Sequence, residues 1–460
     1  MKLSFFVFLI HLFIHGQCDS DIHIPYRVTL AVPAEYSTSF IGRAFLMETN
    51  QMVPSFKAAL SVEALNQKYS CSLDVFLGDV KVWSSGHFSR FYTSEKCVLE
   101  LTQDGDLQLK GQKERLGWRT GTSGQGVERL HLLSMGNLVL VDARNLIIWQ
   151  SFNFPTDVML WGQRLDVATR LTSFPINSSS FYSFEIQHNK IALYLNSGKS
   201  KYSYWEFKPS KNRNITFVAL ASKGLELFND KHKKIAQILP QGLEPLQFLA
   251  VSNKTGNMEL YYYSPSKGKF ESSFKALNST CDLPLACKPY GICTLSNVCS
   301  CIRFVTRDKL DSDCSEGNPG GFCGKNQVDL LELQGVSSVL RSDPNKVNVS
   351  KEECASLCMD DCKCVAALYS SGKDDTDLQK CFLYDMVRGV KQVNKGTGLS
   401  YMVKVPKGAG GGHGKSSGIK KWVLIVVVVV DGLILFLVLG GIGYYVIWKR
   451  RKNSVDNDNN

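Results

Sequence analysis

The chain has 460 residues, of which 44% are apolar and 21% are charged. A chain of this length does not organise around one hydrophobic core, so we expect two or three domains with appended segments. The formal net charge is +11 at pH 7. The basic residues form no stripe interleaved with aromatic residues, however, which argues against a nucleic-acid-binding surface.

The N-terminal sequence MKLSFFVFLIHLFIHGQ has a lysine at position 2, then an apolar run, then small residues near its end. This pattern is typical of a secretory signal peptide and is too short to cross a bilayer comfortably. We expect cleavage after Cys18, which would remove residues 1–18.

A second apolar segment, WVLIVVVVVDGLILFLVLGGIGYYVIW, covers residues 422–448. It is long enough to cross about 30 Å of hydrocarbon. Aromatic residues lie near its ends and the basic run KRRK follows it, as is typical of a stop-transfer helix. The pattern predicts a single-pass type I protein of the plasma membrane, with the bulk of the chain extracellular and residues 449–460 as a cytoplasmic tail.

Asp431 lies inside this apolar segment. A charge there costs about 2.5–3.5 kcal/mol, which the surrounding apolar side chains offset, so the helix can still insert. Two interpretations stay open. Asp431 is protonated or reaches the outer interface, or it contacts a basic or polar group on the membrane helix of a partner protein.

Cysteine usage and glycosylation motifs agree with an extracellular location. Of fifteen cysteines, fourteen remain if Cys18 leaves with the signal peptide, and an even number suits disulfide pairing in an oxidising compartment. The N-x-S/T sequons are at Asn177, Asn214, Asn253, Asn278 and Asn348, which predicts a glycoprotein.

The pattern of residues 19–280 predicts β-strands throughout, because short runs rich in Val, Leu, Phe and Tyr alternate with clusters of turn residues. One step, a glycine turn followed by alternating apolar residues, recurs in DGDLQLK, MGNLVLV, SKGLELF and TGNMELYYY. A single hairpin of this kind cannot bury its apolar face, so several must pack together. We expect two successive all-β domains, at residues 19–165 and 166–280.

Two compact cysteine clusters follow, at residues 281–314 and 323–381. Segments this small need disulfides, worth about 2–4 kcal/mol each, to be stable. In SKEECASLCMDDC, Ser350 and Glu353 indicate a helix N-terminus, and the next cysteines fall at i, i+4 and i+8 on one helix face, at Cys354, Cys358 and Cys362. Metal binding is the alternative, but paired CxxC knuckles are absent from the sequence, which favours disulfides.

The sequence offers little for catalysis. AGGGHGKS, in the Gly-rich linker at residues 404–421, resembles a phosphate-binding loop, but the apolar segment follows within a few residues, where a P-loop requires a helix N-terminus on the ATP side. After removal of residues 1–18, none of the six remaining histidines stands in an H-x-x-x-H ligand pair, and a G-x-S-x-G motif and the kinase signature set are absent from the sequence. We therefore predict no catalytic residue, no cofactor and no metal.

The run GNLVLVDARNLIIWQSFNFPTDVMLWGQRL resembles the bulb-type (G-type) lectin domain of plant S-locus glycoproteins and their receptor-like kinases. CKPYGICTLSNVCSC resembles their EGF-like segment, and EECASLCMDDCKCVAALY resembles their PAN/apple segment. The whole order is most similar to kinase-lacking, PAN-domain-containing members. The resemblance implies a mainly β chain: two tandem β-prism domains, a disulfide-rich EGF-like module at 281–314, an α+β PAN/apple module at 323–403 and one transmembrane helix.

The same resemblance implies a disulfide pattern. The expected pairs are Cys281–Cys293, Cys287–Cys299, Cys354–Cys381 and Cys358–Cys364, with Cys301–Cys314 and Cys323–Cys362 as remainders. Cys71 and Cys97 would then form an extra bridge within the first domain.

Mannose sites of bulb lectins resemble Q-x-D-x-N-x-V-x-Y, in which polar groups bond sugar hydroxyls. The second repeat of this chain has Leu133, Met135, Asn137, Val139 and Val141 at these places. The first has Thr102, Asp104, Asp106, Gln108 and Lys110. Only Asn137, Val139 and Asp104 match, so these residues form a degenerate carbohydrate motif, and a scaffold role is favoured over mannose binding.

The sequence as a whole predicts a receptor-like recognition glycoprotein without a kinase, which binds an extracellular protein or glycan through its lectin-like and PAN modules. Expected partners are that ligand, the lipid bilayer, a membrane co-receptor through Asp431 and a second copy of the chain through the PAN module. The alternatives are an adhesive or decoy lectin that holds wall carbohydrate without signalling and, third, an extracellular enzyme.

Overall fold

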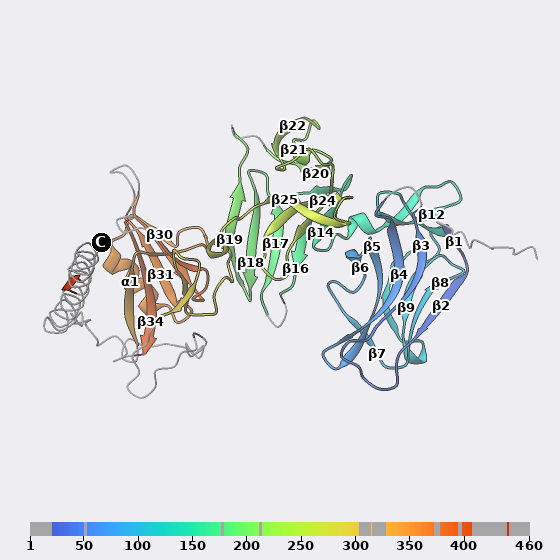
Figure 1. Cartoon of the computed structure of the whole chain (residues 1–460), viewed down its shortest axis with the longest axis horizontal. Coiled ribbons are helices and arrows are strands. Elements are labelled where there is room, and N and C mark those ends of the chain that lie inside the picture. The colour runs from blue at the N-terminus through green and yellow to red at the C-terminus, as the bar shows by residue number, and fades with distance from the viewer. Residues whose placement is uncertain are drawn as a thin grey trace, which may run out of the picture.

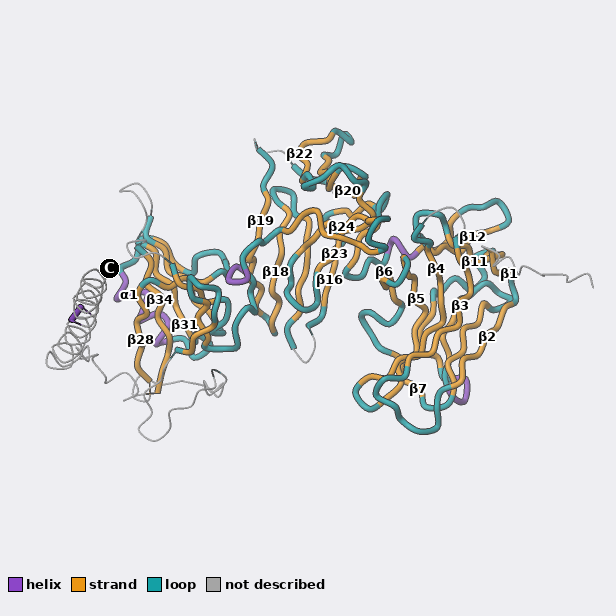
Figure 2. Tube along the Cα trace, in the orientation of Figure 1, coloured by secondary structure: helices purple, strands orange, loops and turns teal. Residues whose placement is uncertain are grey.

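The computed structural model describes residues 21–49, 53–175, 179–210, 214–302, 314, 328–371, 378–393, 398–406 and 439–440. Strands dominate these residues, and the prediction of a mainly β chain is confirmed. The strands gather in three bodies that follow one another along the long axis of the molecule (Figure 1). Short loops join the strands, and helix is confined to brief stretches (Figure 2).

None of the helices within the described ranges is long and apolar enough to cross a membrane. The predicted signal peptide, residues 1–18, lies outside the described residues. So does the predicted span at 422–448 with Asp431, apart from Leu439 and Gly440. These predictions stay predictions.

The first β-unit comprises strands β1 to β13 and contains three sheets. One sheet has the order β1 (Asp21–His23), β11 (Val127–Leu132), β12 (Leu138–Asp142), β13 (Ile147–Gln150). A second has the order β10 (Leu116–Arg119), β9 (Leu107–Lys110), β8 (Lys96–Leu101), β2 (Tyr26–Ala31). The third has the order β3 (Ile41–Glu48), β4 (Phe56–Leu65), β5 (Lys68–Leu77), β6 (Val80–Ser84), with β7 (Phe91–Thr93) paired to β5.

One rule builds all three sheets: three consecutive strands form an antiparallel meander, and one of the first three strands of the chain adds to its edge. β3 joins the first meander, β2 the second and β1 the last. The glycine steps found in the sequence are the turns that open the middle strands. Gly136 has φ of +83°, and a Cβ there would lie 2.4 Å from the Phe56 ring, so only glycine fits.

The second β-unit, strands β14 to β25, repeats this topology. One sheet has the order β14 (Val158–Leu160), β23 (Leu246–Val251), β24 (Met258–Ser264), β25 (Lys269–Lys275). Another has the order β15 (Arg164–Asp166), β20 (Phe217–Ala221), β21 (Gly224–Phe228), β22 (Lys234–Ile238). The last has the order β16 (Arg170–Ser173), β17 (Phe181–Ile186), β18 (Ile191–Ser197), β19 (Ser200–Phe207).

The expected boundary at residues 165/166 falls within β15. Both β14 and β15 begin before that boundary, and they pair with β23 and β20 of the second unit. The reason is that each unit begins with three strands that join the edges of its three sheets. These are β1, β2 and β3 in the first unit and β14, β15 and β16 in the second. The first core also reaches across the junction, because Phe248 of β23 is packed into it.

The third unit, strands β26 to β34 with helix α1 (Lys351–Asp360), contains two sheets. The larger has the order β28 (Val328–Gln334), β34 (Leu399–Pro406), β31 (Ala366–Ser370), β32 (Lys380–Tyr384), β30 (Lys346–Val347). The smaller has the order β27 (Cys299–Cys301), β26 (Gly291–Cys293), β33 (Val390–Gln392), β29 (Val336–Ser338). The segments expected as separate modules at 281–314 and 323–403 therefore share one sheet, through parallel pairing of β26 with β33.

Helix α1 begins as the sequence predicts. Ser350 is its N-cap, and the Ser350 hydroxyl accepts a hydrogen bond from the Glu353 amide at 3.1 Å. Cys354 and Cys358 are buried on one face. Cys362 does not share that face as predicted, because the helix ends at Asp360 and Asp361 is its C-cap.

Disulfide bonds join Cys71–Cys97, Cys281–Cys293, Cys287–Cys299, Cys301–Cys314, Cys354–Cys381 and Cys358–Cys364. Four of these are pairs that the resemblance implies, whereas Cys301–Cys314 is an expected remainder and Cys71–Cys97 is the expected extra bridge. Cys362 is also disulfide-bonded, and its expected partner Cys323 lies outside the described residues. These bridges lie in the first and third units.

The second and third units meet through tyrosines. The Tyr202 hydroxyl donates to Asp385 at 2.8 Å, and the Tyr202 and Tyr384 rings lie 5.6 Å apart. Ser203 and Arg341 exchange two backbone hydrogen bonds, of 2.9 and 2.7 Å. One apolar cluster runs through this joint from Leu193 to Tyr401, so the two units pack as one body.

We predict that the double variant Cys71→Ala/Cys97→Ala loses about 3 kcal/mol of unfolding free energy, because a cross-link over 26 residues no longer restricts the unfolded chain. The bridge ties β5 to β8 in different sheets. Denaturant unfolding followed by tryptophan fluorescence measures the change, with the wild type under reducing conditions as a comparison. An unchanged midpoint and slope would show that the bridge does not brace the first unit.

Candidate ligand-binding site

The predicted carbohydrate residue Asn137 lies inside the first unit, with 3% of its surface exposed. Its Nδ2 donates to Gln150 Oε1 at 2.8 Å, and its Oδ1 accepts from the Ser151 hydroxyl and the Phe152 amide, each at 3.2 Å. Val139 is equally buried. The Asn137 amide therefore holds the end of β13, and it is not directed at a ligand.

Asp104, the third predicted carbohydrate residue, is at the surface and accepts hydrogen bonds from the hydroxyls of Thr102 and Ser123. Its neighbour Asp106 is buried and binds the turn at residues 120–122, accepting from the Gly121 amide at 2.7 Å and the Thr122 amide at 3.1 Å. Both carboxylates thus serve local turns of the chain.

Strand register identifies the equivalent positions in the three meanders. Trp83 lies opposite Val75, Trp118 opposite Leu109, and Trp149 opposite Leu140. Each tryptophan is in the last strand of its meander. The three faces on which a bulb-lectin motif would lie can therefore be compared with one another.

Ion pairs occupy two of these faces. On the second meander, Lys110 binds Glu100 at 2.5 Å, and Arg27 binds the same carboxylate at 2.9 Å. On the first meander, buried Asp74 accepts from the Ser84 hydroxyl at 2.7 Å and pairs with Lys81 at 2.9 Å.

Lys81 also binds Glu63 at 2.8 Å. Burial alone would lower the pKa of Lys81, but the two carboxylates outweigh it and raise that pKa. With Asn137 satisfied internally on the last meander, the described polar groups at the motif positions serve the fold on each face.

The three tryptophans converge at one end of the first unit, each from a different sheet. Their ring centroids are 5.9 to 6.3 Å apart, and each pair meets edge to face at 69–77°. Trp83 and Trp149 are buried while Trp118 is half-buried. The Trp83 indole donates to the Phe154 carbonyl at 2.9 Å, which fixes the chain just after β13.

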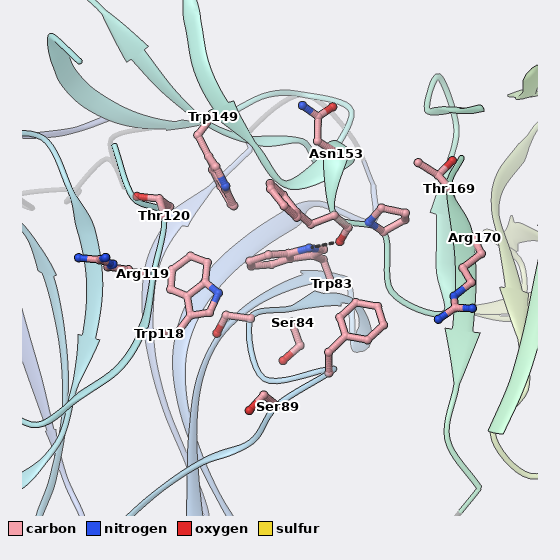
Figure 3. Close-up of a pocket in the computed structure, with 14 residues that line it drawn as sticks. Trp83, Ser84, Ser89, Trp118, Arg119, Thr120, Trp149, Asn153, Thr169 and Arg170 are labelled. Atoms are coloured by element: carbon pink, nitrogen blue, oxygen red, sulfur yellow. Dashed lines mark hydrogen bonds between the residues drawn. The ribbon is translucent and has the colours of Figure 1, made fainter. Parts of the chain in front are cut away.

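A pocket of about 450 Å³ opens over these rings, at the junction with the second unit (Figure 3). Two further aromatic side chains line it, and both are exposed: Phe88 at 58% and Phe154 at 53%. The Phe154 ring stacks on Trp149 at 5.8 Å. The volume is within the range of ligand pockets, which are mostly apolar with a few polar groups.

Hydroxyl, amide and guanidinium groups complete the pocket wall. The neutral polar residues are Ser84, Ser85, Ser89, Thr120, Asn153 and Thr169, and the charged ones are Arg119 and Arg170. Thr169 and Arg170 come from the second unit, so the pocket is built by both units. Hydroxyl-rich walls beside aromatic rings suit a ligand that has both apolar C–H faces and hydroxyls.

His87 fastens the pocket wall at residues 84–89 to the second unit. The His87 ring lies 2.6 Å from the Thr172 carbonyl through Nε2 and contacts Phe88 and Phe174. Burial lowers the pKa of the His87 imidazole and raises the pKa of the Asp157 carboxyl, while the attraction between the two groups opposes both shifts. Asp157, the Asp of the PTD run, thus lies within electrostatic range of His87.

The sequence contained a signal for this site. Trp83, Trp118 and Trp149 end the similar runs VKVW, RLGW and LIIW, but their convergence depends on the register of three separate sheets.

Among the described residues, no cluster of three or more His, Cys, Asp or Glu side chains is placed to hold a metal. Asn214, Asn253, Asn278 and Asn348 are exposed, whereas Asn177 lies outside the described residues.

We predict that Asn137→Ala destabilises the chain by about 2 kcal/mol, because the Ser151 and Phe152 donors lose their buried acceptor. Thermal unfolding measures this loss, and ligand binding should be unchanged. Asp104→Ala, at an exposed turn, is the control and should cost less than about 1 kcal/mol. A binding defect in Asn137→Ala with normal stability would contradict the structural role.

Comparison with known proteins places two domains on the chain. The family model for the D-mannose binding lectin matches residues 81–180, and the PAN domain model matches residues 331–404. Solved structures of a mannose-binding lectin from Gastrodia elata (22% identity, TM-score 0.18, 27% of this chain and 94% of that one) and of a two-domain Scilla campanulata agglutinin (14%, TM-score 0.17, 50% and 94%) also match.

Among relatives in Arabidopsis thaliana, a G-type lectin S-receptor-like serine/threonine-protein kinase is 27% identical over 357 residues, 73% of this chain and 42% of that protein. A PAN domain-containing protein is 26% identical, over 78% and 74%, and an EP1-like glycoprotein is 24% identical, over 63% and 71%. This chain thus spans less than half of the kinase relative. The chain carries a D-mannose-binding-type lectin domain and a PAN domain, and it is a homologue of the plant G-type lectin receptor-like and PAN domain-containing proteins.

Proposed function

We propose that this protein is a receptor-like recognition glycoprotein that binds an extracellular saccharide in the tryptophan pocket between its first and second units. The observation that carries the proposal is the contrast within the lectin domain. The polar groups at the degenerate motif positions are used by the fold, whereas exposed rings and hydroxyls line an open pocket of about 450 Å³.

The chemistry of the pocket suits a sugar ring. One face of a pyranose presents mostly C–H groups, which pack on the negative face of an aromatic ring. The exposed Phe88 and Phe154 rings provide such surfaces, and the Ser89 hydroxyl and the Asn153 side-chain amide line the pocket beside them. Burying the apolar face while the sugar hydroxyls find new partners keeps the cost of removing water low.

The extracellular placement follows the same proposal. The cysteines of the described residues form disulfides in the first and third units, which persist in an oxidising compartment. In this scheme the two β-units are tandem β-prisms, the segment 422–448 anchors the chain in the plasma membrane, and the third unit provides protein contacts. Asp431 would meet a polar group of a co-receptor helix. The chain acts by contact and not by catalysis.

The test uses the full chain in detergent on a glycan array, followed by titration of the best glycan. We expect Phe88→Ala and Phe154→Ala each to weaken binding about three- to tenfold through loss of ring contact. Both side chains are more than half exposed, so folding should survive. Phe45→Ala is the matched control, because Phe45 is 55% exposed on β3 and does not line the pocket.

Two results would reject the site. One is glycan binding that Phe88→Ala and Phe154→Ala leave intact, and the other is an array on which no glycan binds.

A further inference from the structure

We infer that the pocket selects an acidic oligosaccharide, one whose sugar rings carry carboxylates, over neutral glycans of the same shape. This inference rests on the proposed function and adds the ligand class to it. Two observations support the inference: the charged residues that line the pocket are both arginines, and the two β-units contribute one each.

The charge of the pocket wall has one sign. Arg119 and Arg170 are its charged lining residues, and neither Asp nor Glu lines it. Both arginine side chains are exposed, Arg170 at 54%. A one-signed wall favours a ligand of opposite charge and repels amino sugars.

Carboxylates beside the wall do not cancel this charge. The buried carboxylates of Asp74 and Asp106 serve the fold, and Asp157 is half-buried, with its pKa raised by burial. Glu185 is 4.0 Å from Arg170, at the outer limit of an ion pair, and it binds Lys201 at 2.5 Å. Arg170 therefore keeps donors for a ligand, since a guanidinium offers five.

The two arginines lie at opposite ends of the pocket. Arg119 is at the end of β10 in the first unit and Arg170 begins β16 in the second, with the tryptophans between them (Figure 3). A ligand that contacts both arginines crosses the junction between the units, as a chain of sugars does. Guanidinium groups suit this role because they bind carboxylates through two parallel hydrogen bonds.

A matched pair of ligands isolates the charge. Oligogalacturonate and its fully methyl-esterified form have the same rings and linkages, but only the first carries carboxylates. We expect the full chain in detergent to bind the acid form at least about tenfold more tightly than the ester. The acid form should also weaken as salt rises, since salt screens exposed charge, while the ester should not.

Arginine variants then identify which side chains provide the selectivity for carboxylates. Arg119→Gln and Arg170→Gln should each weaken the acid form about three- to tenfold and leave the ester unchanged. Arg144→Gln is the control, because Arg144 is exposed in the turn between β12 and β13 and does not line the pocket. All three changes lie at the surface, so loss of folding does not confuse the result.

The outcomes separate the two proposals. Equal binding of acid and ester, with Phe88→Ala weakening both, overturns the acidic class and keeps the saccharide pocket. Acid-selective binding that both arginine variants leave intact also overturns the inference, because the charge then lies elsewhere. If neither form binds but a neutral glycan does through Phe88, only the ligand class fails. If no glycan binds at all, the proposed function fails with it.

Discussion

The meeting of three tryptophans is the contact on which the first unit depends. A four-stranded sheet cannot bury its inner face alone, and in the first unit each of the three sheets contributes a tryptophan to their common meeting point. Trp83, Trp118 and Trp149 do this from the last strand of each meander, edge to face within 6.3 Å. The same closure leaves ring surface uncovered at one end, and the second unit is attached there.

The junction therefore connects the first and second units and also forms part of the pocket wall. The Phe154 carbonyl accepts the Trp83 indole proton, His87 contacts the Thr172 carbonyl, and Phe248 enters the first core. Further along, Tyr202 and Asp385 join the second unit to the third. Because apolar clusters cross both joints, the three units form one continuous packed body. In the proposed receptor-like role, such a body would transmit the position of a bound ligand along the chain.

Much of this fold could be predicted from local sequence. Glycine steps such as MGNLVLV mark turns because residues such as Gly136 need positive φ beside a packed ring, and Ser350 with Glu353 marks the start of α1. Long-range pairing could not be predicted in this way. Nothing near β14 in sequence shows that it pairs with β23, and the parallel pairing of β26 with β33 merges two segments that appear separate.

The candidate site shows the same division. A motif comparison identified Asn137 as part of a degenerate carbohydrate motif. Its burial and its hydrogen bonds to the end of β13 depend on the tertiary structure and could not be predicted from the motif. The PTD run was visible as a signature, while its proximity to His87, which is far away in the sequence, is a result of the fold.

The central claim is that recognition takes place at the tryptophan junction and not on the outer sheet faces. The most direct measurement is an indole N–H nuclear magnetic resonance titration of the full chain with an oligosaccharide that it binds. We expect the Trp118 and Trp149 signals to shift while Trp161, exposed outside the pocket, stays in place. Unmoved junction indoles, with shifts in the Asn137 and Gln150 side-chain amides instead, would contradict the account.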